Sequence, residues 1–112
     1  MNCCIFTGRL GKDPVETQTK GEKPVTAAHF SIAVSKRYKK EGETDANFIH
    51  CIAYGKTAEF ILKFFKKGMK IEIRARVDTG SYVSRSGQKV YYTDFIVEDA
   101  DFAEKKTEEK ES

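Results

Sequence analysis

The chain has 112 residues, which fits one domain with a single core, and its 20 Lys and Arg against 17 Asp and Glu give a net charge of +3. No apolar run approaches the roughly 20 residues of a membrane-spanning helix, and no basic segment followed by an apolar stretch opens the chain. We therefore expect no membrane association and no secretory signal, and we expect a cytoplasmic protein.

The charge is divided unevenly along the chain. From Glu98 onward there are seven acids and three lysines, which leaves +7 on residues 1–97. A basic body with an acidic end suits a polyanionic ligand, although a solvated surface with an ordinary charged tail would have the same composition.

The first half of the chain is predicted to form strands separated by polar connections. Cys3–Leu10 is the first apolar run, and a turn signal follows it at residues 11–14. Thr17–Pro24 is polar and is predicted to be a loop. Val25–Val34 alternates apolar and polar residues, as expected of a strand with one buried face.

A long charged connection, residues 36–45, leads to a third predicted strand at Asn47–Tyr54. Phe48 and Tyr54 share one parity of this strand, and neither of its faces is plainly polar.

A helix is predicted over Thr57–Lys67, where apolar residues recur at helical spacing. Thr57 is expected to cap its N-terminus, and Gly68 to end it.

The remainder is predicted to form two more strands and a tail. Met69–Gly80 alternates clearly, a hairpin follows at Tyr82–Tyr92, and the fifth strand runs on to Val97. Residues 1–102 are expected to form the domain, and Ala103–Ser112 a short, disordered, charged tail. Five strands with one helix after the third fit an all-β Greek-key barrel of the oligonucleotide/oligosaccharide-binding type, whereas strand alternation alone would also allow a β-sandwich.

Signatures of catalysis are missing from the sequence. It has no phosphate-binding glycine loop followed by lysine and no nucleophile elbow. Its three cysteines form neither a disulfide framework nor the paired spacing of a zinc site. We expect no enzymatic activity, no cofactor and no bound metal.

Aromatic rings interleaved with cations are the most informative pattern. Tyr38 lies within a run of lysines and an arginine, Lys56 follows Tyr54 closely, and Tyr82 precedes a hairpin that carries Arg85. Single-stranded nucleic acid is bound in this way, because bases stack on rings while cations follow the phosphates. For Phe48 and Tyr54, packing in the core is the alternative.

The chain resembles the bacterial and phage-type single-stranded DNA-binding proteins from Met1 to about Phe102. The segments that carry the resemblance are GRLGKDP (residues 8–14), FIHCIAYGKTAE (48–59), KG (67–68) and SYVSRSG (81–87). The resemblance implies an oligonucleotide-binding barrel that assembles as a homotetramer, associates with the nucleoid, and binds single-stranded DNA in replication, recombination and repair.

The resemblance also places the site. It implies that bases stack on Tyr38, Phe48, Tyr54 and Tyr82. Together with the charge pattern, it suggests phosphate contacts from Arg9, Lys36, Arg37, Lys56, Lys67, Arg74, Arg76 and Arg85.

The end of the chain departs from the family pattern of an acidic tail with a terminal Pro-Phe. Here the sequence closes on Glu108-Glu109-Lys110-Glu111-Ser112. The resemblance therefore does not extend to recruitment of replication and repair enzymes through such a tip.

Our leading hypothesis is sequence-tolerant binding and protection of single-stranded DNA. An RNA-binding barrel would use the same rings, and a protein-interaction barrel or a nuclease on this fold are further alternatives.

Overall fold

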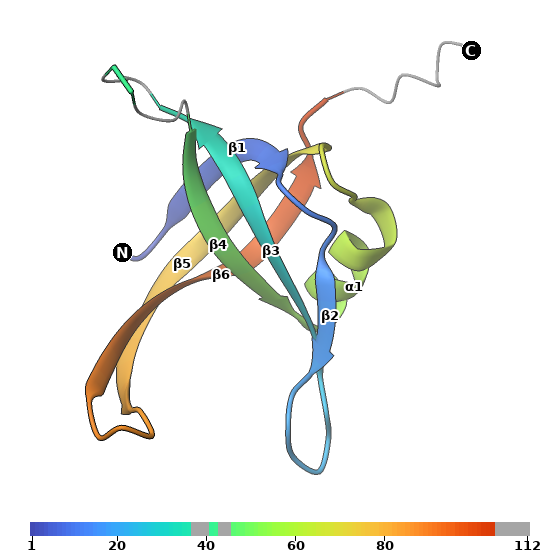
Figure 1. Ribbon diagram of the computed structural model, residues 1–112. Helices are drawn as coiled ribbons and strands as arrows, with labels where there is room; N and C mark the ends of the chain where they lie inside the picture. The colour runs from blue at the N-terminus through green and yellow to red at the C-terminus, as the bar shows by residue number, and fades with distance from the viewer. Residues whose placement is uncertain (37–40, 43–45, 105–112) are drawn as a thin grey trace.

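The computed structural model describes residues 1–36, 41–42 and 46–104 (Figure 1). Within these residues the chain forms six strands and one helix: β1 (Cys4–Leu10), β2 (Val15–Gln18), β3 (Thr26–Ser35), β4 (Ala46–Tyr54), α1 (Gly55–Phe64), β5 (Lys70–Val83) and β6 (Lys89–Phe102). None of the helices described is both long and apolar enough to cross a membrane.

Five of the strands close into a barrel. The sheet runs β1-β5-β6-β4-β3-β2, and the additional pairing of β1 with β3 completes the ring while β2 stays outside it. All pairs are antiparallel except β4 with β6. The predicted oligonucleotide-binding barrel is therefore confirmed, and the β-sandwich is excluded.

Closure of the barrel depends on a glycine in β1. Gly8 is buried beside the point where β1 meets β3, and a Cβ at this position would collide with the carbonyl oxygen of Ala33. Only a residue without a side chain lets the two backbones approach this closely.

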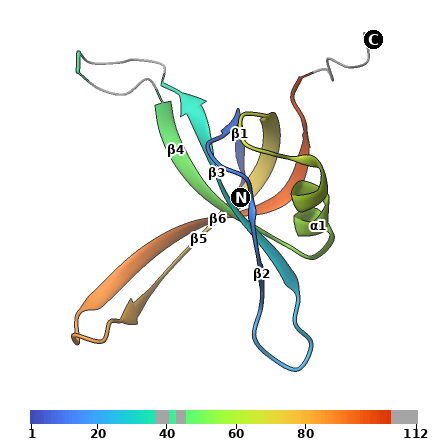
Figure 2. The ribbon, with the colours of Figure 1, turned by 45° about the vertical axis from the view of Figure 1, so that its right-hand side comes forward.

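The core combines inward-facing strand residues with one side of α1. Ile61 and Phe65 are fully buried, and the Phe65 ring stacks on Phe102 with the ring centroids 4.7 Å apart. The helix packs against β3, β4 and β6 (Figures 1 and 2). This apolar cluster holds the barrel together and leaves the outward-facing side chains of the sheet to solvent.

The helix begins earlier than predicted, at Gly55, and it ends at Phe64. Tyr54 occupies the N-cap position with extended backbone and no side-chain cap, so the expected Thr57 cap was wrong. Gly55, with φ of 64°, turns the chain straight from β4 into the helix. Phe65 has extended backbone and enters the core, which ends the helix before Gly68.

The strand β2 lies partly where a loop was predicted. Val15–Gln18 pairs with Thr26–His29 of β3, and all four of its side chains are exposed. The prediction missed β2 because a short exposed strand contributes no apolar face, and its Glu and Gln resemble loop residues.

Candidate nucleic-acid interface

The side chains of β4 divide cleanly between the barrel interior and its outer face. Cys51 and Ala53 point inward and are buried, whereas Phe48 and Tyr54 remain 60% and 42% exposed. Since alternate residues of a strand share one face, both rings lie on the outer surface. Their exposure excludes core packing as the reason for these two aromatics.

The third described ring, Tyr82, lies on the same sheet surface further along β5. Ile52 of β4 pairs with Ile96 of β6, and Ile96 pairs with Arg76 of β5, so these three residues form one row across the outer face. Alternation along β5 from Arg76 then places Tyr82, which is 56% exposed, on this face. The surface thus continues from the barrel onto the β5–β6 hairpin, which projects away from it (Figures 1 and 2).

Tyr38 and Arg37 lie outside the described residues, in the connection between β3 and β4. Lys36 is the last described residue before this connection.

Six of the eight predicted phosphate-binding cations fall into two groups. Three form ion pairs: Arg9 lies 3.1 Å from Glu104, and Glu98 lies 3.3 Å from Arg76 and 3.9 Å from Arg74. By contrast, Lys56, Lys67 and Arg85 are exposed and form no ion pair with another described residue. A phosphate would have to compete with a carboxylate for the side chains of the first group. At Lys67 the backbone N–H donates to Asp13 Oδ1 at 2.7 Å, but the ammonium group forms no ion pair within the described part of the chain.

The Arg9 contact belongs to a small network at the end of the barrel. The guanidinium also donates to the carbonyl oxygen of Gly68 at 2.9 Å. A hydrogen bond from the backbone N–H of Lys70, together with the one from Arg9, lowers the pKa of Glu104. The Arg9 guanidinium is thus held in place by Gly68 and Glu104.

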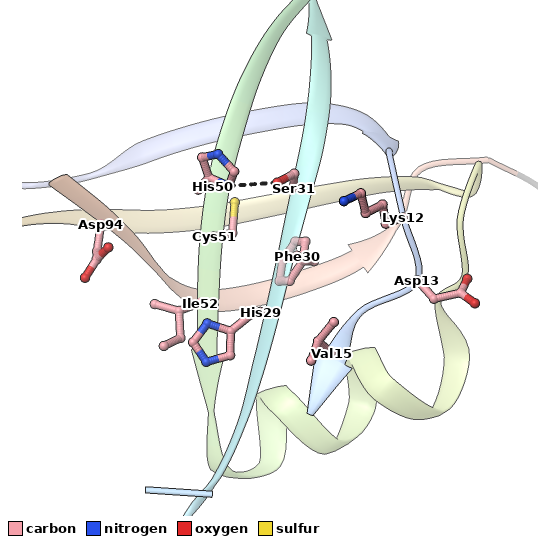
Figure 3. A pocket seen from close by; sticks show the side chains of 10 residues that line it. All are labelled: Lys12, Asp13, Val15, His29, Phe30, Ser31, His50, Cys51, Ile52 and Asp94. Atoms are coloured by element: carbon pink, nitrogen blue, oxygen red, sulfur yellow. Dashed lines mark hydrogen bonds between the residues drawn. The ribbon is translucent and has the colours of Figure 1, made fainter. Parts of the chain in front are cut away.

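A groove between the β1–β2 connection, β3, β4 and β6 lies on the same outer face (Figure 3). Its volume is about 290 Å³, and residues on its walls include Lys12, His29, Ser31, His50 and Asp94. Ser31 Oγ and His50 Nδ1 form a hydrogen bond of 2.8 Å. Lys12 extends toward Ser31, and Asp13 also lines the groove.

The groove adjoins one of the candidate stacking rings. A neighbouring hollow is lined by Gly11, Lys12, Ser31, Phe48 and His50. Lys12 therefore lies beside Phe48, and it forms no ion pair with another described residue. From the sequence, Lys12 was predicted to lie in a turn and was not named as a site residue. The feature that could have indicated it is a cation in a turn between two strands.

Nothing in the described part of the chain resembles a metal centre. Among these residues no group of three or more His, Cys, Asp or Glu side chains could hold an ion. Cys51 is buried and donates to the Ile49 carbonyl oxygen at 3.6 Å, and burial raises the pKa of its thiol to about 12. It is a protonated core residue rather than a ligand.

Comparison with known proteins gives a consistent picture. The model of the single-strand binding protein family matches residues 1–103. The chain is 39% identical to the single-stranded DNA-binding protein of Clostridium perfringens over 102 residues, which cover 91% of this chain and 65% of that protein. It therefore spans slightly less than two thirds of that relative's length.

Two further relatives are matched over more of their length. The chain is 36% identical to single-stranded DNA-binding protein 3 of Clostridium acetobutylicum, covering 93% of this chain and 72% of the relative. It is 35% identical to single-stranded DNA-binding protein 1 of Streptococcus pyogenes, covering 95% and 81%.

Proposed function

The chain belongs to the single-strand binding protein family, and we propose that it binds and protects single-stranded DNA without catalysis during replication, recombination and repair. The observation that carries this proposal is that three exposed rings, Phe48, Tyr54 and Tyr82, lie on one continuous sheet surface. Bases stack on these rings, and Tyr38 adds a fourth. Because every base has a π-face, such binding tolerates any sequence.

Cations beside the rings neutralise the phosphates. Lys56 and Lys12 lie near Tyr54 and Phe48 respectively and form no ion pair with another described residue, so we expect them to contribute most. The remaining proposed contacts are Arg9, Lys36, Arg37, Lys67, Arg74, Arg76 and Arg85. Arg74 and Arg76 must first exchange Glu98 for phosphate.

We also propose that the protein assembles as a homotetramer through its N-terminal strand. Within the described residues β1 pairs with β3 only at Arg9 and Leu10, so its earlier residues present an edge to solvent. Ile5 on this strand is 68% exposed. Pairing with a second copy would cover both the edge and the apolar side chain. A monomeric mass by light scattering at micromolar concentration would contradict this assembly.

Titration of oligo-dT and of a duplex of matched length in one buffer tests the proposed function. We expect tight binding to the single strand that weakens steeply with salt, and little binding to the duplex. Equal affinity for both would overturn the proposal. A competition between DNA and RNA oligomers of the same sequence then distinguishes it from an RNA-binding barrel.

A further inference from the structure

The β5–β6 hairpin presents two different faces to solvent beyond the barrel (Figures 1 and 2). Tyr82 pairs with Val90, and the next pair along is Ser81 with Tyr91. Paired residues share a face and neighbours along a strand alternate, so Tyr91 lies on the face opposite Tyr82. This second face, which continues the barrel interior, also carries the pair of Val83 and Lys89.

The side chains of the second face are too exposed to serve the core. Tyr91 is 73% exposed, more than any other aromatic side chain in the described part of the chain, and Val83 is 69% exposed. A large ring held in solvent gains nothing from the barrel itself, and it is available to a ligand.

The charge of the two faces differs in a way that selects the ligand. On the Tyr82 face, Asp78 lies directly opposite Asp94, which places two carboxylates at the foot of the hairpin. The Tyr91 face, from the Thr79–Thr93 pair to the Val83–Lys89 pair, has no acidic residue. Its cation, Lys89, lies with Nζ 5.4 Å from the Tyr91 ring centroid. A ring beside an ammonium group, with no carboxylate on its face, suits a polyanion that carries flat bases.

We propose that Tyr91 and Lys89 form a second stacking site for single-stranded DNA on the reverse of the hairpin. Single-stranded DNA that crosses the outer barrel face and Tyr82 then passes around the hairpin and stacks one base on Tyr91. The Lys89 ammonium group moves to the phosphate of that nucleotide. This inference rests on the proposed function and extends its path to a surface that the sequence did not indicate.

Affinity for oligo-dT, measured by anisotropy of the labelled strand, tests the site. Tyr91→Ala is expected to lose about 5- to 100-fold in affinity, whereas Tyr91→Phe keeps the ring and the affinity. Ser81→Ala, directly opposite on the same face, is the matched control and should bind as wild type does. Lys89→Gln should lower the slope of log affinity against log salt by about 1. Iodouracil placed in the strand should cross-link to Tyr91.

The outcomes separate this inference from the proposed function. If wild type binds oligo-dT and Tyr91→Ala binds equally well, the second site is wrong and the function stands. If Tyr91→Ala changes the mass of the free protein in light scattering, the face contacts a second copy and the inference is overturned. If wild type does not bind oligo-dT, the proposed function fails and the inference fails with it.

Discussion

Phe48 and Tyr82 are aromatic side chains that the fold itself does not require, since both are more than half exposed. We expect Phe48→Ala and Tyr82→Ala each to weaken oligo-dT binding by about 1–3 kcal/mol, with the free energy of unfolding changed by no more than about 0.5 kcal/mol. Phe65→Ala is the contrasting variant, because this ring is fully buried and its loss should cost about 3–5 kcal/mol of stability.

Denaturant titration and oligo-dT binding on the same samples check this separation. If Phe48→Ala and Tyr82→Ala merely unfold the protein, the rings are structural and the proposed stacking site is lost. If both variants fold and still bind oligo-dT as wild type does, bases do not stack on these two rings and the proposed stacking site is wrong.

Cations with and without carboxylate partners should differ in their effect on salt dependence. Lys12→Gln removes a charge beside Phe48 that has no ion-pair partner among the described residues, and it should reduce the slope of log affinity against log salt by about 1. Arg76→Gln should reduce it less, because Glu98 already neutralises that guanidinium at 3.3 Å. Oligo-dT titrations at several salt concentrations measure both slopes. A larger change for Arg76→Gln would show that phosphate displaces Glu98 readily.

Burial of the Cys51 thiol should make the free energy of unfolding depend on pH in the alkaline range. Its pKa rises from 9.0 to about 12 on burial, so unfolding becomes easier as the pH climbs above the unfolded value. The stability that the neutral thiol contributes is complete below about pH 9 and is lost progressively toward pH 12. The advantage of wild type over Cys51→Ala in unfolding free energy should therefore shrink between these values. An advantage that is independent of pH would contradict the assignment.

At the scale of elements, closure of the barrel depends on the contact between β1 and β3. Gly8→Ala places a methyl group against the Ala33 carbonyl oxygen and should destabilise the protein by about 1–3 kcal/mol. Gly11→Ala is the matched control, because a Cβ there meets nothing within 4 Å and its φ is not positive. Thermal unfolding of the two variants gives the comparison, and equal midpoints would show that β1 and β3 can separate without cost.

Most elements could be predicted from the sequence because their side chains report burial directly. The alternation of Ile71, Ile73 and Ala75 predicts β5, and all three are buried. The helix start could not be predicted in this way, because the turn at Gly55 depends on a backbone conformation and the chain enters α1 without a side-chain cap. A Thr near a helix start is a weak signal when tertiary contacts fix the boundary.

The candidate site was predictable in its residue types more than in its geometry. Aromatic rings next to cations could be read from the sequence, and Phe48, Tyr54 and Tyr82 are exposed. The pairing of Arg74 and Arg76 with Glu98 was not visible, because the partners lie on different strands joined by a hairpin. The position of Lys12 beside Phe48 depends on how β1 and β4 meet in space.

At the scale of the whole molecule, the outer sheet surface is continuous from the barrel to the hairpin and forms one path for single-stranded DNA. The hairpin gives this path its reach, since it continues the β5–β6 ladder beyond the barrel to the pair of Val83 and Lys89. Assembly through β1 would bring several such paths together without covering Phe48 or Tyr54, which lie on β4.

Tyrosine emission during titration with oligo-dT tests the stacking of bases on this surface most directly, because the chain has no Trp. We expect the single strand to quench the emission of wild type. In the variant with both Tyr54→Phe and Tyr82→Phe, stacking persists at these two positions without their tyrosine emission, while Tyr38, Tyr91 and Tyr92 still emit. The affinity should therefore stay the same while the quenched part of the signal becomes smaller. If quenching in that variant is as large as in wild type, bases do not stack on these rings, and the account of the interface is wrong.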